Sequence, residues 1–116
     1  SNEVGAGAGE RAADQLATMP DRPTAVIAGN DLVAFSLISA LGQRGISVPR
    51  DISVVGFDGL PSGARNNPPL TSVQQPFAEM GRIAIRLAEQ AANGGAVEHV
   101  VLEPQLLVRS STRELQ

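Results

Sequence analysis

Two apolar runs separated by a helical pattern constrain the fold of this chain more than any other feature. The first run is Ala25 to Ala28, and the second is Ile52 to Val55, with Ser53 as its one polar interruption. Parallel strands that are buried on both faces have near-continuous apolar sequences of this kind, and a helix between two such strands makes a βαβ unit. The sequence therefore predicts an α/β fold, with a parallel sheet and flanking helices.

Each apolar run leads into a polar residue, Asn30 after the first and Asp58 after the second. Ligands of open parallel sheets bind outside the carboxyl ends of the strands, so we expect the two side chains to lie side by side at a small-molecule site. An amide donates and accepts hydrogen bonds, whereas a carboxylate only accepts. This pair suits a polyhydroxy or amine-bearing molecule. Two other roles stay open, because Asn30 can cap the following helix and Asp58 can start a turn.

The helix expected after Asn30 is apolar nearly all round. Most of its surface is filled by apolar residues: Leu32, Val33, Leu37, Ile38, Ala40 and Leu41. Phe35 lies on a further side of the helix. Such a helix must be covered on more than one side. We expect the sheet to cover one side and a partner subunit to cover the other, with Gly45 forming the left-handed cap at the end of the helix.

The flanking segments have weaker patterns. Residues 1–9 are interpreted as a tag remnant and a flexible N-terminus, because no strand precedes their glycines as a dinucleotide loop would require. Glu10 to Met19 is predicted to be a helix. Leu60 to Pro69 is predicted to be a loop, and Leu70 to Gln74 a third extended segment.

A long helix is predicted after Pro76, where the missing N–H of proline costs nothing. Its apolar residues recur at helical spacing: Phe77, Met80, Ile83, Ala84, Leu87, Ala88 and Ala91. Two short extended segments, His99 to Leu102 and Gln105 to Val108, are predicted to follow it.

The composition argues against several classes of function. The 116 residues carry a net charge of −3, so this segment lacks the Lys/Arg surplus that binding to a nucleic acid backbone needs. Cysteine is absent, which excludes a disulfide framework and thiolate metal sites. No apolar run approaches the ~20 residues of a membrane span. We expect no contact with a membrane.

Catalysis and metal binding are not expected. His99 is the single histidine, and without a second histidine or a cysteine it predicts neither a zinc site nor a nucleophilic triad. The chain has no lysine, and Asn30 with Asp31 is a poor substitute for an acidic pair, which argues against a phosphoacceptor role for Asp58. We therefore expect no catalytic residues, no metal and no cofactor.

Four strings in the chain resemble the C-terminal part of a LacI/GalR-family transcriptional regulator: PTAVIAGND, GISVPRDISVVGFDG, PPLTSVQQPFAEMGRIAIRLAE and VVLEPQLLVRSST. They occur in family order from about Ala12 onward. The resemblance implies a partial lobe of the type I periplasmic-binding-protein-like fold, in which a ligand lies between two α/β lobes. Residues 10–116 would then form a truncated effector-binding and dimerisation domain. Within it, residues 10–74 and 105–113 belong to the second lobe, and residues 75–104 form the crossover and first-lobe elements.

The resemblance also implies roles for individual residues. Asn30 and Asp58 match effector-binding residues, and Gln75 and Phe77 lie in a crossover segment that borders the ligand. The start of the helix after Asn30 and the loop after Asp58 match the dimer-forming surface, which here comprises Leu32, Val33, Phe35, Ser36 and Arg65.

The function implied is the sensing of a small-molecule effector, a sugar or a related metabolite, in a cytoplasmic bacterial regulator. DNA would be contacted only through an N-terminal helix-turn-helix domain that this chain lacks. The alternative is a periplasmic sugar-binding protein of a transporter. Because the strand Thr24 to Ala28 would lack its usual neighbour in the sheet, we expect a homodimer formed by edge pairing or by exchange of a segment.

Overall fold

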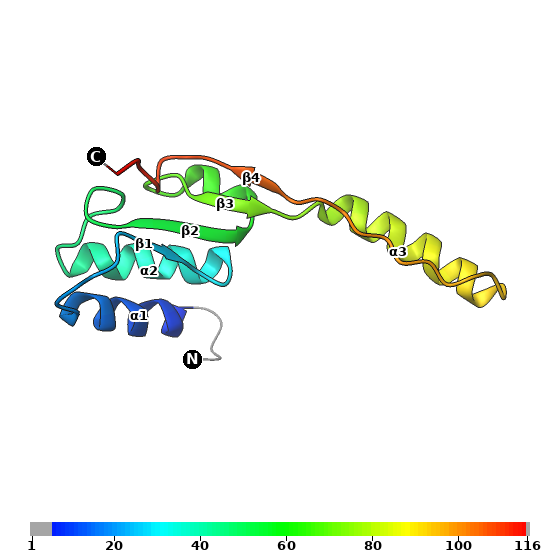
Figure 1. The fold of residues 1–116 in the computed structure, drawn as a ribbon, viewed down its shortest axis with the longest axis horizontal. Coiled ribbons are helices and arrows are strands. Elements are labelled where there is room, and N and C mark those ends of the chain that lie inside the picture. The colour runs from blue at the N-terminus through cyan, green and yellow to red at the C-terminus, as the bar shows by residue number, and fades with distance from the viewer. Residues whose placement is uncertain (1–5, 116) are drawn as a thin grey trace.

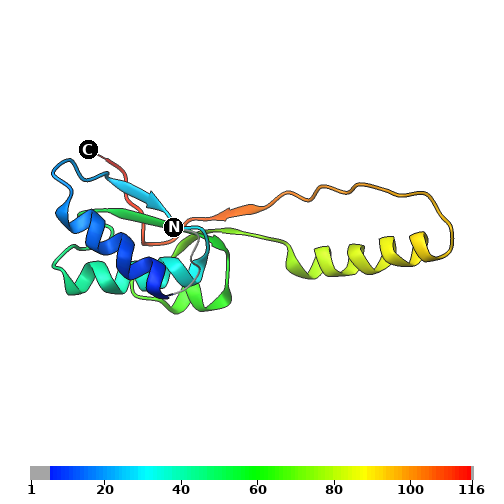
Figure 2. The same ribbon diagram turned by 90° about the horizontal axis from the view of Figure 1, so that it is seen from below.

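The structure, a computed structural model, describes residues 6–115. The molecule is elongated, with extents of 58 × 28 × 24 Å. Figures 1 and 2 show a layered part and a projecting part. We call residues 6–74 and 105–115 the body, and residues 75–104 the arm.

The body contains one four-stranded sheet in the order β1-β2-β3-β4. The strands are β1 (Ala25–Ile27), β2 (Ser53–Asp58), β3 (Thr71–Gln74) and β4 (Gln105–Leu107). The first three strands are parallel, and β4 is antiparallel to β3. The predicted α/β class with a mainly parallel sheet is therefore confirmed.

Two helices, α1 (Ala6–Thr18) and α2 (Asp31–Gln43), pack against each other beside this sheet (Figures 1 and 2). α2 contacts β2, and α1 faces β1. We expected a partner subunit to cover the second side of α2. α1 of the same chain covers part of that side, and for this part the expectation was wrong. Leu32 nevertheless remains 59% exposed, so the dimer surface stays a prediction.

The hydrophobic core lies between the two helices and the sheet. Its largest fully buried side chains come from α2, β2 and the segments that flank β2 and β3: Leu37, Leu41, Ile52, Val54 and Leu70. α1 contributes Ala13 and Leu16. Aromatic residues make up only 3% of the chain, and the buried core is accordingly built from aliphatic side chains.

α1 begins at Ala6, four residues before the expected Glu10, so residues 6–9 are helical rather than flexible. Residues 1–5, the rest of the expected flexible N-terminus, lie outside the described residues. Gly9 is buried because α1 approaches α2 closely there, and a Cβ atom on Gly9 would lie 2.6 Å from the backbone nitrogen of Leu37. The glycine that resembled part of a linker instead permits two helices to touch.

The end of α2 follows the prediction. Gly45 has a φ of +75°, and the N–H of Ile46 donates to the carbonyl of Leu41 at 2.9 Å. The N–H of Gly45 also donates to the carbonyl of Gly42 at 3.1 Å. These two bonds form a Schellman motif, which satisfies carbonyls that the helix leaves free.

Two predicted segments differ in the structure. The loop after β2 contains a 3₁₀ helix, η1 (Pro61–Arg65). His99 to Leu102, predicted to be an extended segment, belongs to no strand, because the arm provides no sheet beside it.

The arm consists of α3 (Phe77–Ala92) and the segment that returns along it to β4 (Figure 2). Asn93 is the C-cap residue of α3, and Gly94 follows it with a φ of +76°. No residue of α3 is buried. No helix in the described part of the chain is long and apolar enough to cross a membrane.

Candidate functional site

The two polar residues that follow the first two strands lie at the same edge of the sheet. The register of β1 and β2 pairs Ile27 with Val55, and Asn30 and Asp58 each lie three residues further along. Because β1 and β2 are adjacent and parallel, this places both residues beyond the carboxyl ends of neighbouring strands. This edge faces the arm (Figure 1).

Asn30 caps α2. Its Oδ1 accepts a hydrogen bond from the N–H of Val33 at 2.8 Å, and its own φ of −158° is extended, as at a helix N-cap. The capping role left open by the sequence is therefore observed. The cap uses only the oxygen, and within residues 6–115 the side-chain nitrogen has no hydrogen-bond partner. It is free to donate to a ligand.

Asp58 ends β2 in an uncommon backbone conformation. Its φ is +122°, a conformation that costs a non-glycine residue about 1–3 kcal/mol and persists only where the surroundings impose it. Its Oδ1 accepts a hydrogen bond from Nε2 of Gln75 at 2.8 Å, and the N–H of Gln75 donates to the carbonyl of Asp58 at 3.2 Å. The structure thus joins two of the predicted site residues directly.

A buried carboxylate that the sequence pattern did not single out supports this turn. Asp31 is fully buried and accepts hydrogen bonds from the N–H of Leu60 at 2.7 Å and from Oγ of Ser72 at 2.6 Å. In the sequence, Asp31 was considered together with Asn30, as a poor substitute for an acidic pair. The signal in the sequence was Gly56, because a glycine inside an apolar strand often marks a close approach of another group. In the structure that group is the carboxylate of Asp31, with which a Cβ atom on Gly56 would collide.

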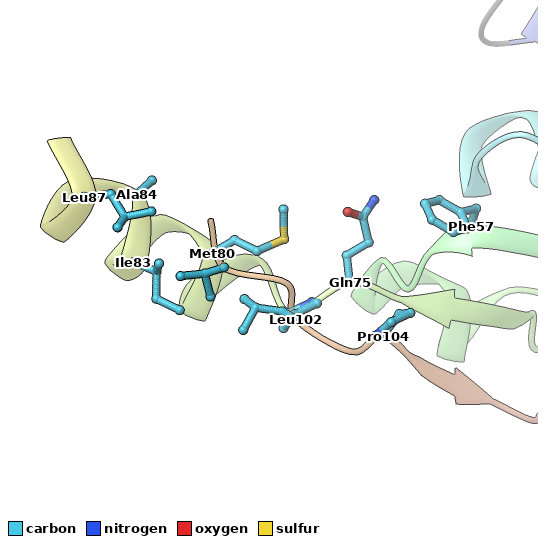
Figure 3. A pocket seen from close by; sticks show the side chains of 10 residues that line it. Phe57, Gln75, Met80, Ile83, Ala84, Leu87, Leu102 and Pro104 are labelled. Atoms are coloured by element: carbon cyan, nitrogen blue, oxygen red, sulfur yellow. The ribbon is translucent and has the colours of Figure 1, made fainter. Parts of the chain in front are cut away.

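An apolar groove of about 350 Å³ adjoins the Asp58–Gln75 pair (Figure 3). Gln75 and Phe57 line its end at the body, and Met80, Ile83 and Leu102 are among the residues that line it along the arm. The side chains of Phe57 and Gln75 point to the same side of the ribbon in Figure 3, and Phe57 is 38% exposed. The sequence pattern missed Phe57, although its place directly before a strand-end aspartate was a signal.

The other predicted site residues line separate hollows. Phe77 is 50% exposed and shares with Gln75 a shallow depression that also contacts Gly59 and Arg82. Asn30 lines a cavity of about 380 Å³ between β1 and α1. The structure therefore joins Asp58 to Gln75 and aligns Asn30 beside them, but it does not gather the four predicted residues in one enclosed pocket.

The chemistry of this edge is that of binding. It offers one carboxylate, two amides and two exposed aromatic rings, which together accept hydrogen bonds, donate them and cover apolar surface. Among the described residues, no group of three or more His, Cys, Asp or Glu side chains is placed to hold a metal ion.

Comparison with known sequences supports one class of protein. The model of the periplasmic binding protein-like domain matches residues 1–112. The HTH-type transcriptional repressor PurR of Photobacterium profundum is 40% identical over 90% of this chain and 32% of the repressor. PurR of Mannheimia succiniciproducens is 38% identical over 88% of this chain and 31% of that repressor. The chain spans about a third of the length of these curated relatives.

Solved structures give the same result. A LacI family transcriptional regulator from Bifidobacterium animalis subsp. lactis has a TM-score of 0.88 and 30% identity, covering 95% of this chain and 41% of the regulator. The lac repressor dimer bound to operator and the anti-inducer ONPF has a TM-score of 0.85 and 31% identity, covering 93% and 38%. A LacI family regulator from Arthrobacter sp. FB24 in complex with lactose has a TM-score of 0.81 and 32% identity, covering 96% and 42%.

Proposed function

Because the chain belongs to the periplasmic binding protein-like domain family, we propose that it forms the effector-sensing and dimer-forming part of a bacterial DNA-binding transcriptional regulator. The regulator works in the cytoplasm, where its DNA lies. Contact with DNA is made by a helix-turn-helix domain outside this chain, consistent with the net charge of −3 on this segment.

The observation that carries the proposal is the Asp58–Gln75 hydrogen bond at the carboxyl edge of the sheet, with Asn30 beyond the neighbouring strand. A small polar ligand that replaces or extends this bond meets an acceptor from Asp58 and donors from Gln75 and Asn30. Phe77, in the depression beside Gln75, and Phe57, in the adjoining groove, each offer an aromatic face for the apolar side of a sugar ring. Lactose bound to the Arthrobacter regulator supports a sugar or a related metabolite as the effector.

The position of this edge accounts for signalling. It lies where the body meets the arm (Figure 1), so a ligand bound there contacts both parts and favours one of their relative orientations. A ligand shifts such an equilibrium only by the difference in its affinity for the two orientations. In the regulator, that shift changes the geometry of the DNA-contacting domains.

We also propose that two copies of the regulator form a homodimer. The start of α2 and the loop after β2 provide its surface, which comprises Leu32, Val33, Phe35, Ser36 and Arg65. Leu32 is 59% exposed, and Arg65 lies on the exposed 3₁₀ helix.

In this chain taken alone, pairing at the free edge of β1 or exchange of the arm between two copies adds to the association. β1 lies at the edge of the sheet, and Ile27 is 79% exposed there. Sedimentation velocity tests this, and a folded monomer at micromolar concentration contradicts it.

The test of effector binding is a thermal-shift screen of this chain against monosaccharides, disaccharides and nucleosides, followed by calorimetry with the compounds that stabilise it. Asp58→Asn is expected to weaken binding roughly tenfold or more, because hydrogen bonds to a charged group contribute about 1.5–3 kcal/mol. Asp21→Asn, at an exposed carboxylate between α1 and β1, is the matched control. Equal affinity of the two variants for the same compound contradicts the assignment.

A further inference from the structure

We infer that Asp31 is a positioning residue: it holds the turn that carries Asp58 and ties this turn to the first turn of α2. The inference rests on the proposed function for its role in effector sensing. The positioning itself is a property of the ligand-free chain and can be measured without any effector.

The two backbone N–H groups that follow Asp58 are both held by one buried pair of side chains. Ser72 Oγ accepts from the N–H of Gly59 at 3.0 Å and donates to Oδ1 of Asp31 at 2.6 Å. Oδ2 of Asp31 accepts from the N–H of Leu60 at 2.7 Å. Asp31 and Ser72 are both fully buried, so these bonds form out of contact with water, where an unpaired donor or acceptor is costly.

Glycines on both sides of the Asp58 turn permit close approaches that a Cβ atom would block. A Cβ atom on Gly56 would collide with Oδ1 of Asp31, so the strand passes directly against the carboxylate. Gly59 has a φ of +72°, and a Cβ atom there would lie 2.6 Å from Cα of Gln74. The turn therefore lies in close contact with β3. The hydrogen bonds to Gly59 and Leu60, which follow Asp58, account for why Asp58 keeps its unfavourable φ of +122°.

Asp31 also belongs to α2. It is the first residue of the helix, between the cap residue Asn30 and the exposed Leu32. A negative charge in the first turn is favoured by the helix dipole, which offsets part of the cost of its burial. A movement of the Asp58 turn therefore pulls on the first turn of α2, where the proposed dimer surface begins. One side chain joins the proposed ligand contact to the proposed subunit contact.

The opposite end of the sheet provides a control of similar chemistry. Ser111 is fully buried, donates from its Oγ to the carbonyl of Val54 at 2.6 Å and accepts from the N–H of Thr71 at 2.8 Å. It ties the chain after β4 to the starts of β2 and β3. Loss of the Ser111 hydroxyl is expected to lower the free energy of unfolding, as loss of the Ser72 hydroxyl does. It is not expected to change the hydrogen bonds of the Asp58 turn.

The first experiment measures amide hydrogen exchange by NMR in the ligand-free chain, with Leu41 in the core as the internal reference. In Asp31→Asn and in Ser72→Ala, exchange at Gly59 and Leu60 relative to Leu41 is expected to rise roughly tenfold, which corresponds to the loss of one hydrogen bond to a charged or buried partner. The side-chain amide signals of Gln75 are expected to move in both variants. Ser111→Ala is expected to change the exchange of Gly59 and Leu60 relative to Leu41 by no more than about twofold, because it lowers the stability of the whole fold and so affects all three amides alike.

An unchanged ratio in Ser72→Ala, or an equal rise in Ser111→Ala, overturns the inference. If Asp31→Asn fails to fold, Ser72→Ala decides alone, because it removes one hydroxyl and keeps the carboxylate.

The second experiment tests the link to α2. Asp58→Asn is expected to shift the amide signals of Leu32 and Val33, and this shift is expected to fall by at least half in an Asp31→Asn or Ser72→Ala background. The same shift in all backgrounds overturns the link.

The inference and the proposed function fail separately. If no compound binds in the calorimetric test but the exchange ratios change as expected, the effector role is wrong and the positioning stands. If a compound binds through Asp58 but the ratios do not change, the effector role stands and the positioning is wrong.

Discussion

The body and the arm of this molecule each contain a helix rich in apolar residues, but the two helices differ in what these residues contact. In α2, Ala34, Leu37 and Leu41 are buried in the core that this helix forms with the sheet and α1. In α3 no residue is buried, and Ile85 is 64% exposed. Helical periodicity therefore identifies the face that needs cover, while the cover itself depends on which other elements the same chain supplies.

The groove of the arm illustrates this difference. Along the arm, its apolar side chains face the returning segment around Leu102, which belongs to no strand and forms no second layer of sheet (Figure 3). In the body, by contrast, the core is enclosed between the sheet and two helices. We expect the stability of the chain to come from the body. Three pairs of substitutions test that expectation, and a pH dependence within the body sharpens it.

The largest contrast is expected between one leucine of the core and one isoleucine of the arm. Leu41→Ala creates a cavity at a fully buried site and is expected to cost about 2–5 kcal/mol in the free energy of unfolding. Ile85→Ala is expected to change it by less than ~0.5 kcal/mol, since an exposed side chain loses little. Urea titration followed by circular dichroism measures both. A similar loss in both variants means that the arm is packed in the native assembly.

The second contrast uses glycine-to-alanine changes in two helices. Gly9→Ala places a methyl group against Ser36 and the backbone of Leu37, so it is expected to destabilise the body by about 1–3 kcal/mol despite the better helix propensity of alanine. Gly81→Ala meets nothing within 4 Å and is expected to stabilise α3 by roughly 0.5–1 kcal/mol. Midpoints of thermal unfolding and the helical signal test the opposite signs. A loss for Gly81→Ala shows that another chain contacts that position.

The third contrast compares two ion pairs. In the body, Nη2 and Nε of Arg44 lie 2.6 Å and 2.9 Å from Oδ1 of Asp14, which ties α1 to the end of α2. In the arm, Nη1 of Arg86 lies 3.6 Å from Oε2 of Glu98, with both side chains half exposed. Asp14→Asn is expected to cost about 0.2–1 kcal/mol, and Glu98→Gln nothing measurable. Repeating the unfolding in 1 M salt should remove most of the Asp14 effect, and an effect that persists contradicts the electrostatic explanation.

The smallest effect is expected from pH, at the turn that leads into β2. The N–H of Ser47 donates to Asp51 at 2.7 Å and, with Arg50, holds the pKa of that carboxyl below its ordinary value of 3.8. A lowered pKa in the folded state contributes stability above pH 3.8, and this contribution is lost as the pH falls through the folded value. The difference in stability between wild type and Asp51→Asn is therefore expected to shrink below pH 3.8. A constant difference from pH 7 to pH 3 contradicts this.

Local pattern predicted much of the body. Alternation of apolar runs and a helical period indicated parallel strands and the helix between them, and Gly45 marked the end of that helix. The same rules placed Asn30 and Asp58 at one edge, because parallel neighbours end on the same side of a sheet. Boundaries failed where a residue type had two uses, as at Gly9, which permits close packing rather than chain flexibility.

The sequence by itself thus determined the elements, their direction and the edge at which a ligand would bind, since these depend on neighbours within a few residues. Only the tertiary structure decided that Asp31 is buried against Leu60 and Ser72, 29 and 41 residues away, and that Gln75 contacts Asp58 across 17 residues. It also decided that α1 covers α2 and that nothing in the described part of the chain buries α3. Contacts between distant segments depend on how whole elements pack, and no local period encodes that packing.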